Sequence, residues 1–512
     1  MTSDPVATTP SEDDAAPTPD PSRRRWFPLT GTAAVALLVG SVAALVASRP
    51  LYDNSFFTHL ATGRLLLAGN FPRRNPFLWT GTDFPMPSWW WSGVLAAVDR
   101  VAGAAGLRLL AGVLAGLLGA LLVRLTHPVG PDRAGGVDIV AAGRVGGDGN
   151  RTLLAVVAPP ALTLFTLFPF LNTRPQLAGF LLLGVTVLVW REGRSAWLLV
   201  PVFATWVNVH GTWLYGVMVL GLLVVAEAVD VRRIGRRALE LGLAAVAGTA
   251  LGGLLYPDRF ELLLLPTCQF GNEVDRQATR SYREWEPLHV NEPIGWAFGV
   301  LVLIALWGCV RNRRWAMSAV TVLLAFMGIS SSRMVPIAAV ALVPFAAMGM
   351  DGLGTLRPPQ GRAAIVATSV GVAVCLAAGA LAVGTKGYDL STYPVAAVDW
   401  LAERNLVANS KVHVVTHDYV GNYLELRYGA NAHAYVDDRP DARTLLDYRA
   451  MRRFEPGWKA AFNRANADVV LWESNKKFPR AVAQLDGWTV AARKGKFTVL
   501  CRDTVAAQCL GR

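Results

Sequence analysis

The chain has 512 residues, of which 53% are hydrophobic and only 17% are charged. Because a soluble domain carries about 25% charged residues, this composition excludes an ordinary soluble enzyme and points to the lipid bilayer. The formal net charge is +12, but the arginines lie between hydrophobic segments and form no single basic face. We therefore interpret them as topology signals and exclude nucleic acid as a partner.

Residues 1–29 are rich in Pro, Asp, Ser and Thr and predict a disordered cytoplasmic tail. The tail ends in Arg23, Arg24 and Arg25, directly before the apolar run 30–48. Three arginines before the first span place the N-terminus in the cytoplasm. The long tail and the long apolar run favour an uncleaved anchor over a cleaved signal peptide.

Further apolar segments follow, each near the length that a bilayer requires. With the first run they predict a polytopic α-helical membrane protein of about 11 transmembrane helices within residues 30–384. Segments 195–209 and 315–330 are short, and a tilted or re-entrant element is an alternative at either. The spans after the first are expected at 105–125, 153–171, 175–190, 195–209, 212–229, 238–255, 294–310, 315–330, 334–350 and 364–384.

The arginines between these segments predict the orientation. Alternation places five arginine-containing loops on the cytoplasmic side, at 126–152, 191–194, 230–237, 311–314 and 351–363. The segments 49–104 and 256–293 are expected to be outer loops, and acidic residues outnumber arginines in the second. This distribution obeys the positive-inside rule. It predicts a multi-pass plasma (inner) membrane protein whose C-terminal domain is extracytoplasmic.

Residues 385–512 predict a small extracytoplasmic α/β domain. Lys411–Thr416 and Asp468–Trp472 are expected to be buried strands, with helical patterns at about 442–453 and 456–465 between them. The strands Trp488–Arg493 and Lys496–Arg502 flank Lys494-Gly495, a plausible two-residue hairpin turn.

Two cysteines lie near the C-terminus of this domain. Cys501 and Cys509 are able to pair if the C-terminus is outside the cell. Two unpaired thiols are the alternative, and the sequence does not decide between them.

The segment after the first span carries the first candidate site. On a helix, Asp53, Phe56, Phe57, Leu60 and Arg64 share one side, and His59 lies off that stripe. A carboxylate in this place could act as general base on an acceptor hydroxyl, or hold a divalent cation such as Mg²⁺ or Mn²⁺. The alternative is a helix-capping aspartate and an interfacial histidine.

Three other outer junctions carry polar residues: Asn172–Gln176, Trp206–Gly211 with Asn208 and His210, and Ser330–Pro336. Arg174 and Arg333 are each the only charge of their hydrophobic neighbourhood on that side. Arginine is costly in hydrocarbon, and two arginines on one face could clamp a phosphate or pyrophosphate. The alternative is snorkelling to lipid headgroups.

Two acidic segments supply the remaining candidate site residues. Glu284, Glu286 and His289 end the long outer loop and could supply a second carboxylate, or belong to a solvated charged loop. In the outer domain the stretch Asp437–Asp441, which contains Arg439, follows a strand. Polar residues at the carboxyl ends of strands are where α/β folds bind ligands, so these side chains could bind acceptor sugar or a cation. A salt-bridged supporting loop is the alternative.

Segment 51–97 resembles the first outer loop of the GT-C superfamily of integral-membrane glycosyltransferases, in its protein-mannosyltransferase and aminoarabinose-transferase branches. Asp53 stands at the first acidic position, Gly69-Asn-Phe-Pro72 at the turn, and Met86-Pro-Ser-Trp-Trp-Trp91 at the step into an aromatic run. The whole chain is similar to a bacterial branch of GT-C-like proteins. Four elements carry that similarity: His59–Arg64, Arg174–Gln176, Asn208–Gly211 and Asp437–Asp441.

The resemblance implies a GT-C-like fold and a hexosyl or pentosyl transferase. Its donor would be a polyprenyl-phosphate-linked sugar, and its acceptor a cell-envelope glycan, lipid or protein on the extracytoplasmic face. Asp53 would be the catalytic carboxylate, and the only metal ligand if there is one, while His59 would position a substrate. The residues expected to bind substrate are Arg64, Arg174, Asn208, His210, Glu284, Arg333, Asp437 and Arg439.

One position departs from the family. Residue 54 is Asn, so the usual acidic pair is incomplete. Asp53 then works alone or with Glu284 or Glu286, or metal dependence or catalysis itself has been lost. Lipid-sugar polymerases and ligases, the runner-up group in this architecture, rely on arginines instead, which Arg174 and Arg333 would satisfy.

Two other classes of function remain. A non-catalytic envelope scaffold, with the outer domain as binding module, is favoured by Asn54. A lipid or solute transporter is disfavoured, because the expected spans have almost no ionisable residues away from their ends, whereas coupled transport needs such residues near the midplane.

Overall fold

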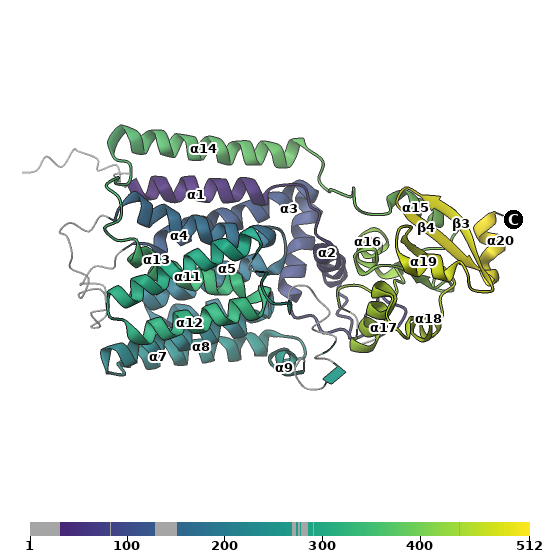
Figure 1. Ribbon diagram of the computed structural model, residues 1–512, viewed down its shortest axis with the longest axis horizontal. Helices are drawn as coiled ribbons and strands as arrows, with labels where there is room; N and C mark the ends of the chain where they lie inside the picture. Colours follow the sequence, from purple (N-terminus) through teal and green to yellow (C-terminus); the bar gives the residue numbers. More distant parts are fainter. Residues whose placement is uncertain are drawn as a thin grey trace, which may run out of the picture.

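The structure is a computed structural model. It describes residues 31–81, 83–127, 151–268, 273–274, 277, 285–289, 291–439 and 441–511. A bundle of long, roughly parallel helices is followed by a smaller domain with a sheet, which lies at one end of the bundle (Figure 1). The expected tail 1–29 and Glu284 lie outside the described residues.

The bundle has an apolar helix at each position where the sequence predicts a span. The helices up to residue 384 are α1 Gly31–Ala47, α2 Asn54–Leu67, α3 Trp89–Leu125, α4 Leu153–Thr166, α5 Pro175–Arg191, α6 Leu199–Val209, α7 Trp213–Val231, α8 Arg236–Leu255, α9 Glu261–Cys268, α11 Pro293–Arg311, α12 Trp315–Ser330, α13 Val335–Gly349 and α14 Gly361–Gly384. Short 3₁₀ turns, η4 Phe168–Phe170, η5 Ala196–Leu198 and η7 Ser332–Met334, lie at helix ends.

Six helices of the described part are long and apolar enough to cross a membrane: α3, α7, α8, α11, α13 with its preceding turn, and α14. The apolar helices α1, α4, α5, α6 and α12 are shorter. A helix of 17 residues is only about 26 Å long, a little less than the hydrocarbon core. The structure is thus consistent with the predicted class, a helical membrane protein. The predicted number of about 11 spans stays a prediction.

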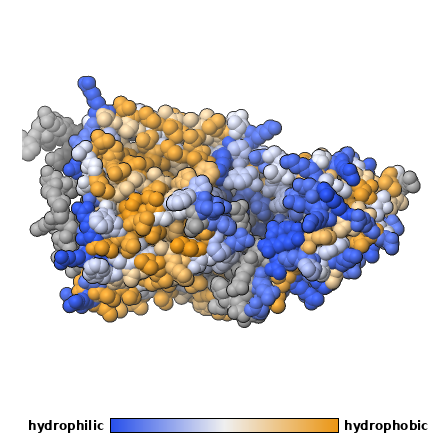
Figure 2. Space-filling view, viewed as in Figure 1, coloured by the Kyte–Doolittle hydropathy of each residue, from blue (hydrophilic) through white to orange (hydrophobic). Residues whose placement is uncertain are grey.

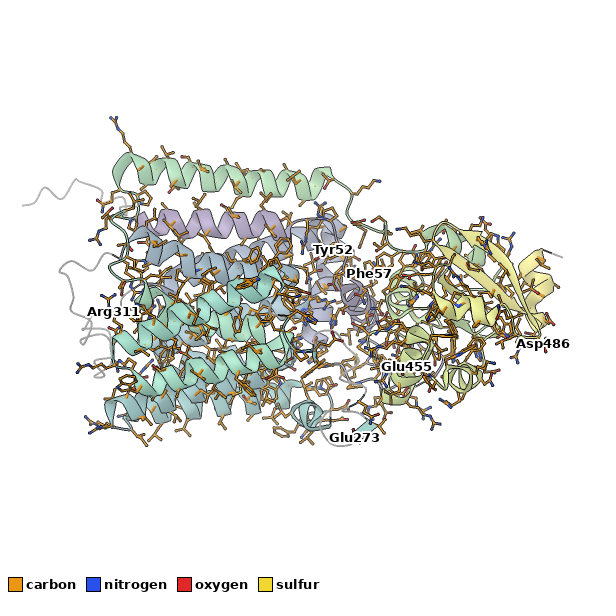
Figure 3. All side chains as sticks on the ribbon, viewed as in Figure 1. Tyr52, Phe57, Glu273, Arg311, Glu455 and Asp486 are labelled. Atoms are coloured by element: carbon orange, nitrogen blue, oxygen red, sulfur yellow. A yellow bond between two sulfur atoms is a disulfide. The ribbon has the colours of Figure 1, made fainter. Side chains whose placement is uncertain are left out.

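Hydrophobic side chains cover the bundle as a broad band, and hydrophilic residues gather toward both of its ends (Figure 2). Several arginines expected in cytoplasmic loops meet at the end far from the sheet domain, where Figure 3 shows Arg311. Arg151 Nε lies 3.1 Å from Asp351, and Arg311 donates to the Asp351 carbonyl. Loops distant in the sequence therefore form one arginine-rich surface.

The C-terminal domain is the expected α/β module. Its four-stranded sheet has the order β1-β2-β4-β3, with β1 parallel to β2 and the other pairs antiparallel. Its elements are α15 Val395–Glu403, β1 Val414–Val415, α16 Asp418–Tyr428, η8 Gly429–Asn431, α17 Ala442–Arg453, α18 Trp458–Ala465, β2 Val469–Glu473, α19 Lys477–Val482, β3 Trp488–Lys494, β4 Phe497–Arg502, η9 Asp503–Val505 and α20 Ala506–Leu510.

Local predictions for this domain hold with small corrections. The first strand is shorter than expected, and the hairpin loop is Gly495-Lys496, one residue later than Lys494-Gly495, since Lys494 pairs with Phe497. Gly495 has a φ of 58°, which a primed hairpin turn requires. Cys501 and Cys509 form a disulfide, which decides between the two alternatives that the sequence left open.

The C-terminal domain shares its hydrophobic core with the segment after the first helix. Phe57 and Leu60 of α2 belong to the same buried cluster as Val398 and Tyr423 of the domain. The backbone is also joined, because Leu51 pairs with Tyr388 in an isolated β-bridge. Phe57 accordingly lies between bundle and domain in Figure 3. This shared core fixes the domain over the end of the bundle where α2 lies.

Candidate functional site

An ion pair links the start of α2 to the start of α5. Asp53 occupies the N-cap position of α2, but its side chain caps no backbone N–H. Its carboxylate instead accepts hydrogen bonds from Arg174 Nε, at 2.6 Å, and from Asn172 Nδ2, at 3.2 Å. Asn172 Oδ1 also accepts from the Arg174 backbone N–H, and Pro175 follows at the first helical position of α5. The turn before α5 therefore directs the Arg174 side chain toward Asp53.

His59 lies on α2 and is partly buried. Its Nδ1 is 3.1 Å from the Ser92 hydroxyl on α3. The two helices touch here because residue 63 is Gly: a Cβ at this position would stand 1.8 Å from the Ser92 carbonyl oxygen. Burial and the positive charges of Arg439 and Arg174 lower the pKa of His59 to about 3. The imidazole is therefore neutral at pH 7.

His210 follows the last residue of α6 and is a second neutral histidine. Its Nδ1 accepts from the Thr212 backbone N–H at 3.2 Å. Burial lowers the pKa of His210 well below its usual value, and Arg333, His59 and Arg174 lower it further. The charge of Arg174 acts on both histidines, and that of Arg333 acts on His210, so these groups lie within electrostatic reach of one another. We refer to His59, His210, Arg174 and Arg333, together with Asp53, which pairs with Arg174, as the cluster.

Arg333 enters this cluster from η7. Its guanidinium carbon lies 5.1 Å from the centre of the Trp285 ring. The neighbouring Ser332 donates its backbone N–H and its hydroxyl to the Glu286 carbonyl oxygen, at 2.9 and 3.1 Å. Glu286 therefore takes part through its backbone carbonyl. His289 is exposed.

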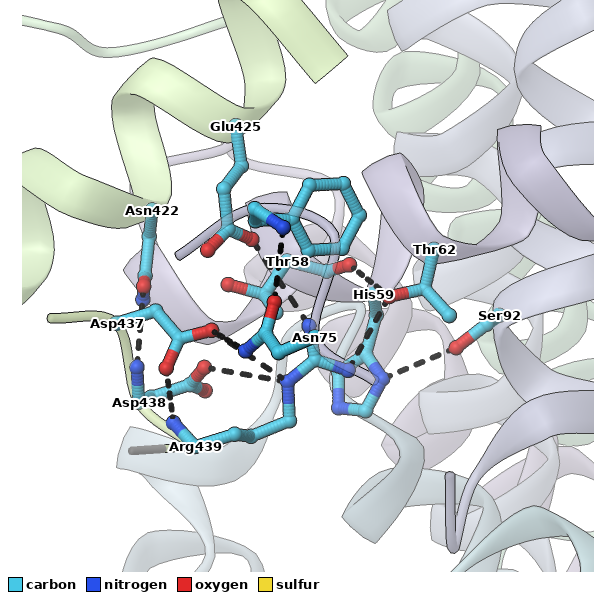
Figure 4. A network of polar contacts seen from close by, with 11 residues as sticks. Thr58, His59, Thr62, Asn75, Ser92, Asn422, Glu425, Asp437, Asp438 and Arg439 are labelled. Carbon is cyan, nitrogen blue, oxygen red and sulfur yellow. Dashed lines mark hydrogen bonds and ion pairs between the residues drawn. The ribbon is translucent and has the colours of Figure 1, made fainter. Parts of the chain in front are cut away.

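The C-terminal domain adds a network around Arg439 (Figure 4). Asp437 is buried and accepts from Asn75 Nδ2, at 3.2 Å, and from the Arg439 backbone N–H, at 2.7 Å. Arg439 Nη1 donates to Thr62 on α2 at 3.1 Å, and the guanidinium lies 4.3 Å from the centre of the Phe84 ring. Arg439 thereby ties the domain to α2 on the side of His59.

Two further carboxyl groups lie beside Arg439. Asp438 accepts a hydrogen bond from the Ser55 hydroxyl; burial raises the pKa of Asp438 to about 6, against the lowering effects of Arg439 and Arg174. Glu425 of α16 is fully buried, 3.9 Å from Arg439 Nη2. Burial and the Asp437 charge raise the pKa of Glu425 well above its usual range. Sequence reasoning missed Glu425, and the only signal for it is a polar residue on the apolar face of its helix.

Arg64 and Asn208, which were expected to bind substrate, make hydrogen bonds to other parts of the protein. Arg64 is half-exposed and pairs with Asp99 at 2.8 Å, while it also donates to the Leu426 carbonyl at 3.1 Å. Asn208 is fully buried; its oxygen accepts from Trp89 Nε1 at 2.7 Å and its amide donates to the carbonyls of Ala204 and Gly252. Both residues therefore link helices of the protein.

The donors around Asp53 do not fit Mg²⁺ or Mn²⁺. Its carboxylate faces N–H groups of Arg174 and Asn172, which cannot ligate a cation and, for Arg174, repel one. Among the described residues, no three His, Cys, Asp or Glu side chains are grouped so as to hold a metal. We therefore derive no step that uses a metal at Asp53.

Several polar atoms next to the cluster are buried without a hydrogen-bond partner in the described part of the chain. They are Thr58 Oγ1, beside His59 in the sequence, and Thr173 Oγ1 and Gln176 Oε1, on either side of Arg174. An unsatisfied buried polar group costs about 1–3 kcal/mol. Native proteins have few such groups, and each of them calls for an explanation.

The comparisons with known proteins identify no relative. No protein family matches the chain, and no curated protein is detectably similar to it.

Proposed function

We propose that this protein is a membrane glycosyltransferase that moves a sugar from a polyprenyl-phosphate donor to an extracytoplasmic cell-envelope acceptor. The observation that carries the proposal is the cluster of Asp53, His59, Arg174, His210 and Arg333 at the end of an apolar bundle. A lipid-linked phosphate needs cations at the boundary between hydrocarbon and water, and this cluster supplies them there.

The proposed orientation places the arginine-rich end of the bundle in the cytoplasm, in accordance with the positive-inside rule. The C-terminal domain and the cluster then face the outside. The Cys501–Cys509 disulfide supports this side, because disulfides persist in oxidising compartments. The proposal includes the shorter apolar helices as spans, which makes about 11 crossings of the bilayer.

The charges of the cluster fit an anion. Both histidines of the cluster are neutral, so its positive charges are Arg174, which pairs with Asp53, and Arg333. Arginine binds phosphate oxygens in a planar, bidentate geometry. In this proposal the two arginines hold the donor phosphate, and the neutral histidines offer ring nitrogens to donor or acceptor hydroxyls.

The reaction exchanges one bond at the anomeric carbon. The acceptor hydroxyl oxygen forms a bond to that carbon, while the bond from the carbon to the phosphate oxygen breaks. The electron pair stays on the polyprenyl phosphate, whose charge Arg174 and Arg333 stabilise. The hydroxyl proton must pass to a base. We assign Asp53 to positioning Arg174, since both groups that it binds are N–H donors.

The alternative function is a non-catalytic envelope scaffold. The observation that favours it is the network around Arg439, because this network joins the domain to α2 without requiring a reaction. A test that separates the alternatives uses purified protein in liposomes. Short-chain prenyl phosphates with labelled hexoses and pentoses serve as donors, and a cell-envelope extract serves as acceptor. The proposal expects transfer of at least one sugar; no transfer with any donor would overturn it, and movement of intact donor across the vesicle would favour a transporter.

A further inference from the structure

Two parallel strands of the C-terminal domain end beside each other. β1 and β2 pair in parallel, with Val415 opposite Val470, so their carboxyl ends lie at the same edge of the sheet. His417 follows β1 in the chain, and Glu473 is the last residue of β2. In open α/β sheets, ligands bind outside the carboxyl ends of the strands, so this edge is where a ligand of the domain is expected.

A chain of hydrogen bonds determines which ring nitrogen of His417 carries the proton. Tyr448 of α17 donates its hydroxyl to Asp418 Oδ1 at 2.9 Å. The Tyr448 oxygen is then left to accept a hydrogen bond from His417 Nδ1, which lies 3.2 Å away. Burial, together with the charges of Arg452 and Lys476, lowers the pKa of His417 to about 3, so its ring is neutral at pH 7. Nε2 of His417 is therefore an acceptor without a proton.

Two buried ring nitrogens at this edge have no hydrogen-bond partner among the described residues. They are Nε2 of His417 and Nε1 of Trp472. The two rings are in contact, with centres 3.9 Å apart, and both side chains are buried. The indole N–H can only donate, and this imidazole nitrogen can only accept. Hydroxyl groups supply both the lone pair and the proton that these two nitrogens lack.

Partly exposed side chains continue this edge to the surface. The ring of Tyr419 stacks on that of His417, with centres 5.4 Å apart, and the Tyr419 hydroxyl donates to Glu473 Oε1 at 3.2 Å. Asp418, Tyr419 and Glu473 are each partly exposed. A sugar ring has an apolar face of C–H groups and a rim of hydroxyls, so an aromatic ring beside carboxylate oxygens matches it on both counts.

We propose that this edge of the C-terminal domain binds a saccharide, with hydroxyl groups of the sugar on His417 Nε2, Trp472 Nε1 and the Glu473 carboxylate. The structure offers a proton acceptor, a proton donor and an anionic acceptor there, next to the ring of Tyr419. The ligand class follows from this set, because a group with several neighbouring hydroxyls satisfies all three.

This edge is joined to the start of α2 by one side chain. The ring centre of Tyr393 lies 5.7 Å from that of Tyr419, and the Tyr393 hydroxyl donates to the Tyr52 carbonyl at 3.2 Å. Tyr52 directly precedes Asp53 of the cluster. The bound saccharide is then part of the acceptor, and this assignment rests on the proposed function, whereas saccharide binding itself does not.

The experiment measures saccharide binding by the purified full-length protein in phospholipid nanodiscs, without a donor. The probes are radiolabelled methyl glycosides of glucose, galactose, mannose and arabinose, together with their monodeoxy analogues, and equilibrium dialysis gives each Kd. The wild type is compared with Glu473→Gln, Trp472→Phe and Asp486→Asn. Asp486 is an exposed carboxylate at the far end of the same domain (Figure 3), and it serves as the matched control for Glu473.

The inference expects the wild type to bind at least one probe with a Kd of about 10 mM or lower. Glu473→Gln removes an anionic acceptor, and Trp472→Phe removes the indole N–H but keeps a buried ring, so each should raise Kd about tenfold. Asp486→Asn should bind as the wild type does. One monodeoxy analogue should bind the wild type and Trp472→Phe equally, because it lacks the hydroxyl that contacts the indole.

Two results would overturn the inference. One is the absence of binding to every probe, in which case the two ring nitrogens bind water only. The other is an unchanged Kd in either folded variant, and Glu473→Gln decides the matter if Trp472→Phe does not fold. Binding without any sugar transfer would overturn the proposed function and leave the saccharide site standing. Transfer with an unchanged KM for the acceptor in Glu473→Gln would remove the assignment to the acceptor.

Discussion

Arg174 Nε lies 2.6 Å from Oδ1 of Asp53, although the two residues are 121 positions apart in the chain. Asn172 holds both partners, through its amide N–H to Asp53 and its oxygen to the Arg174 backbone. This pair connects the segment after the first helix with the junction before α5. It joins two residues that the sequence offered as separate candidates, and in the proposed function it gives Asp53 a positioning role.

Asp53→Asn tests that role. The variant keeps the shape of the side chain and removes the charge that orients Arg174, so we expect KM for the donor to rise about tenfold, or about 1.4 kcal/mol, with kcat within about twofold of wild type. Steady-state kinetics in liposomes measures both constants. Asp99→Asn is the control, because Asp99 pairs with Arg64. A lost kcat at unchanged KM would make Asp53 the proton acceptor instead.

Gly63→Ala tests the close contact that holds His59. The new methyl group would stand 1.8 Å from the Ser92 carbonyl oxygen, so α2 must move away from α3. Overpacking of this kind costs about 1–3 kcal/mol, and we expect a lower melting temperature in detergent together with weaker transfer. Gly93→Ala is the control on α3, since its methyl group meets nothing within 4 Å. Equal melting temperatures of the two variants would show that α2 moves away from α3 without loss of stability.

Glu425→Gln tests the buried carboxyl group at the domain junction. Because the folded-state pKa of Glu425 is raised, the folded protein binds a proton that the unfolded chain releases near its usual value. The stabilisation from this group is complete below that usual value and is lost as pH rises through the raised pKa. Glutamine stays neutral, so we expect the melting temperature of the variant to depend less on pH above about 4.5. Parallel pH profiles of the variant and the wild type would contradict the raised pKa.

Removal of the disulfide tests the C-terminal domain. Replacing Cys501 and Cys509 by Ser frees a short loop, for which the chain-entropy relation gives about 2–3 kcal/mol of lost stability. Hydrogen exchange of the β3–β4 hairpin should therefore quicken. Cys375→Ser is the control, because Cys375 is an exposed free thiol. Thiol reagents that label residues 501 and 509 in the wild type before reduction would count against the pairing.

The helices of the bundle follow from local sequence, which is why they were predictable. Long apolar runs separated by arginines leave few other conformations for the backbone in a bilayer, and α7, α8 and α11 lie within a few residues of the predicted spans. The first strand of the small domain was predicted too long, as Lys411–Thr416, because hydrophobicity marks burial, whereas strand ends depend on partners. Only Val414–Val415 find a partner in β2.

The site was predictable only in part. Asp53, His59, Arg174, His210 and Arg333 stand out as polar residues at the ends of apolar segments. The structure pairs Asp53 with Arg174 and puts Arg174 within electrostatic reach of both histidines. Arg64 and Asn208 stand out for the same reason but pair within the fold. The position of Asp438 near Ser55 and the burial of Glu425 depend on how the C-terminal domain packs on α2, which spacing in the sequence does not encode.

The central claim is that Arg174 holds the phosphate of a lipid-linked sugar donor. The most direct measurement is sugar transfer from a labelled short-chain prenyl-phosphate sugar by purified wild type, Arg174→Lys and Arg64→Lys in liposomes. Lysine keeps the charge but loses bidentate binding, so the account predicts that Arg174→Lys raises KM for the donor about tenfold or more, while Arg64→Lys resembles the wild type. Identical kinetics of all three proteins, or no transfer by the wild type, would contradict it.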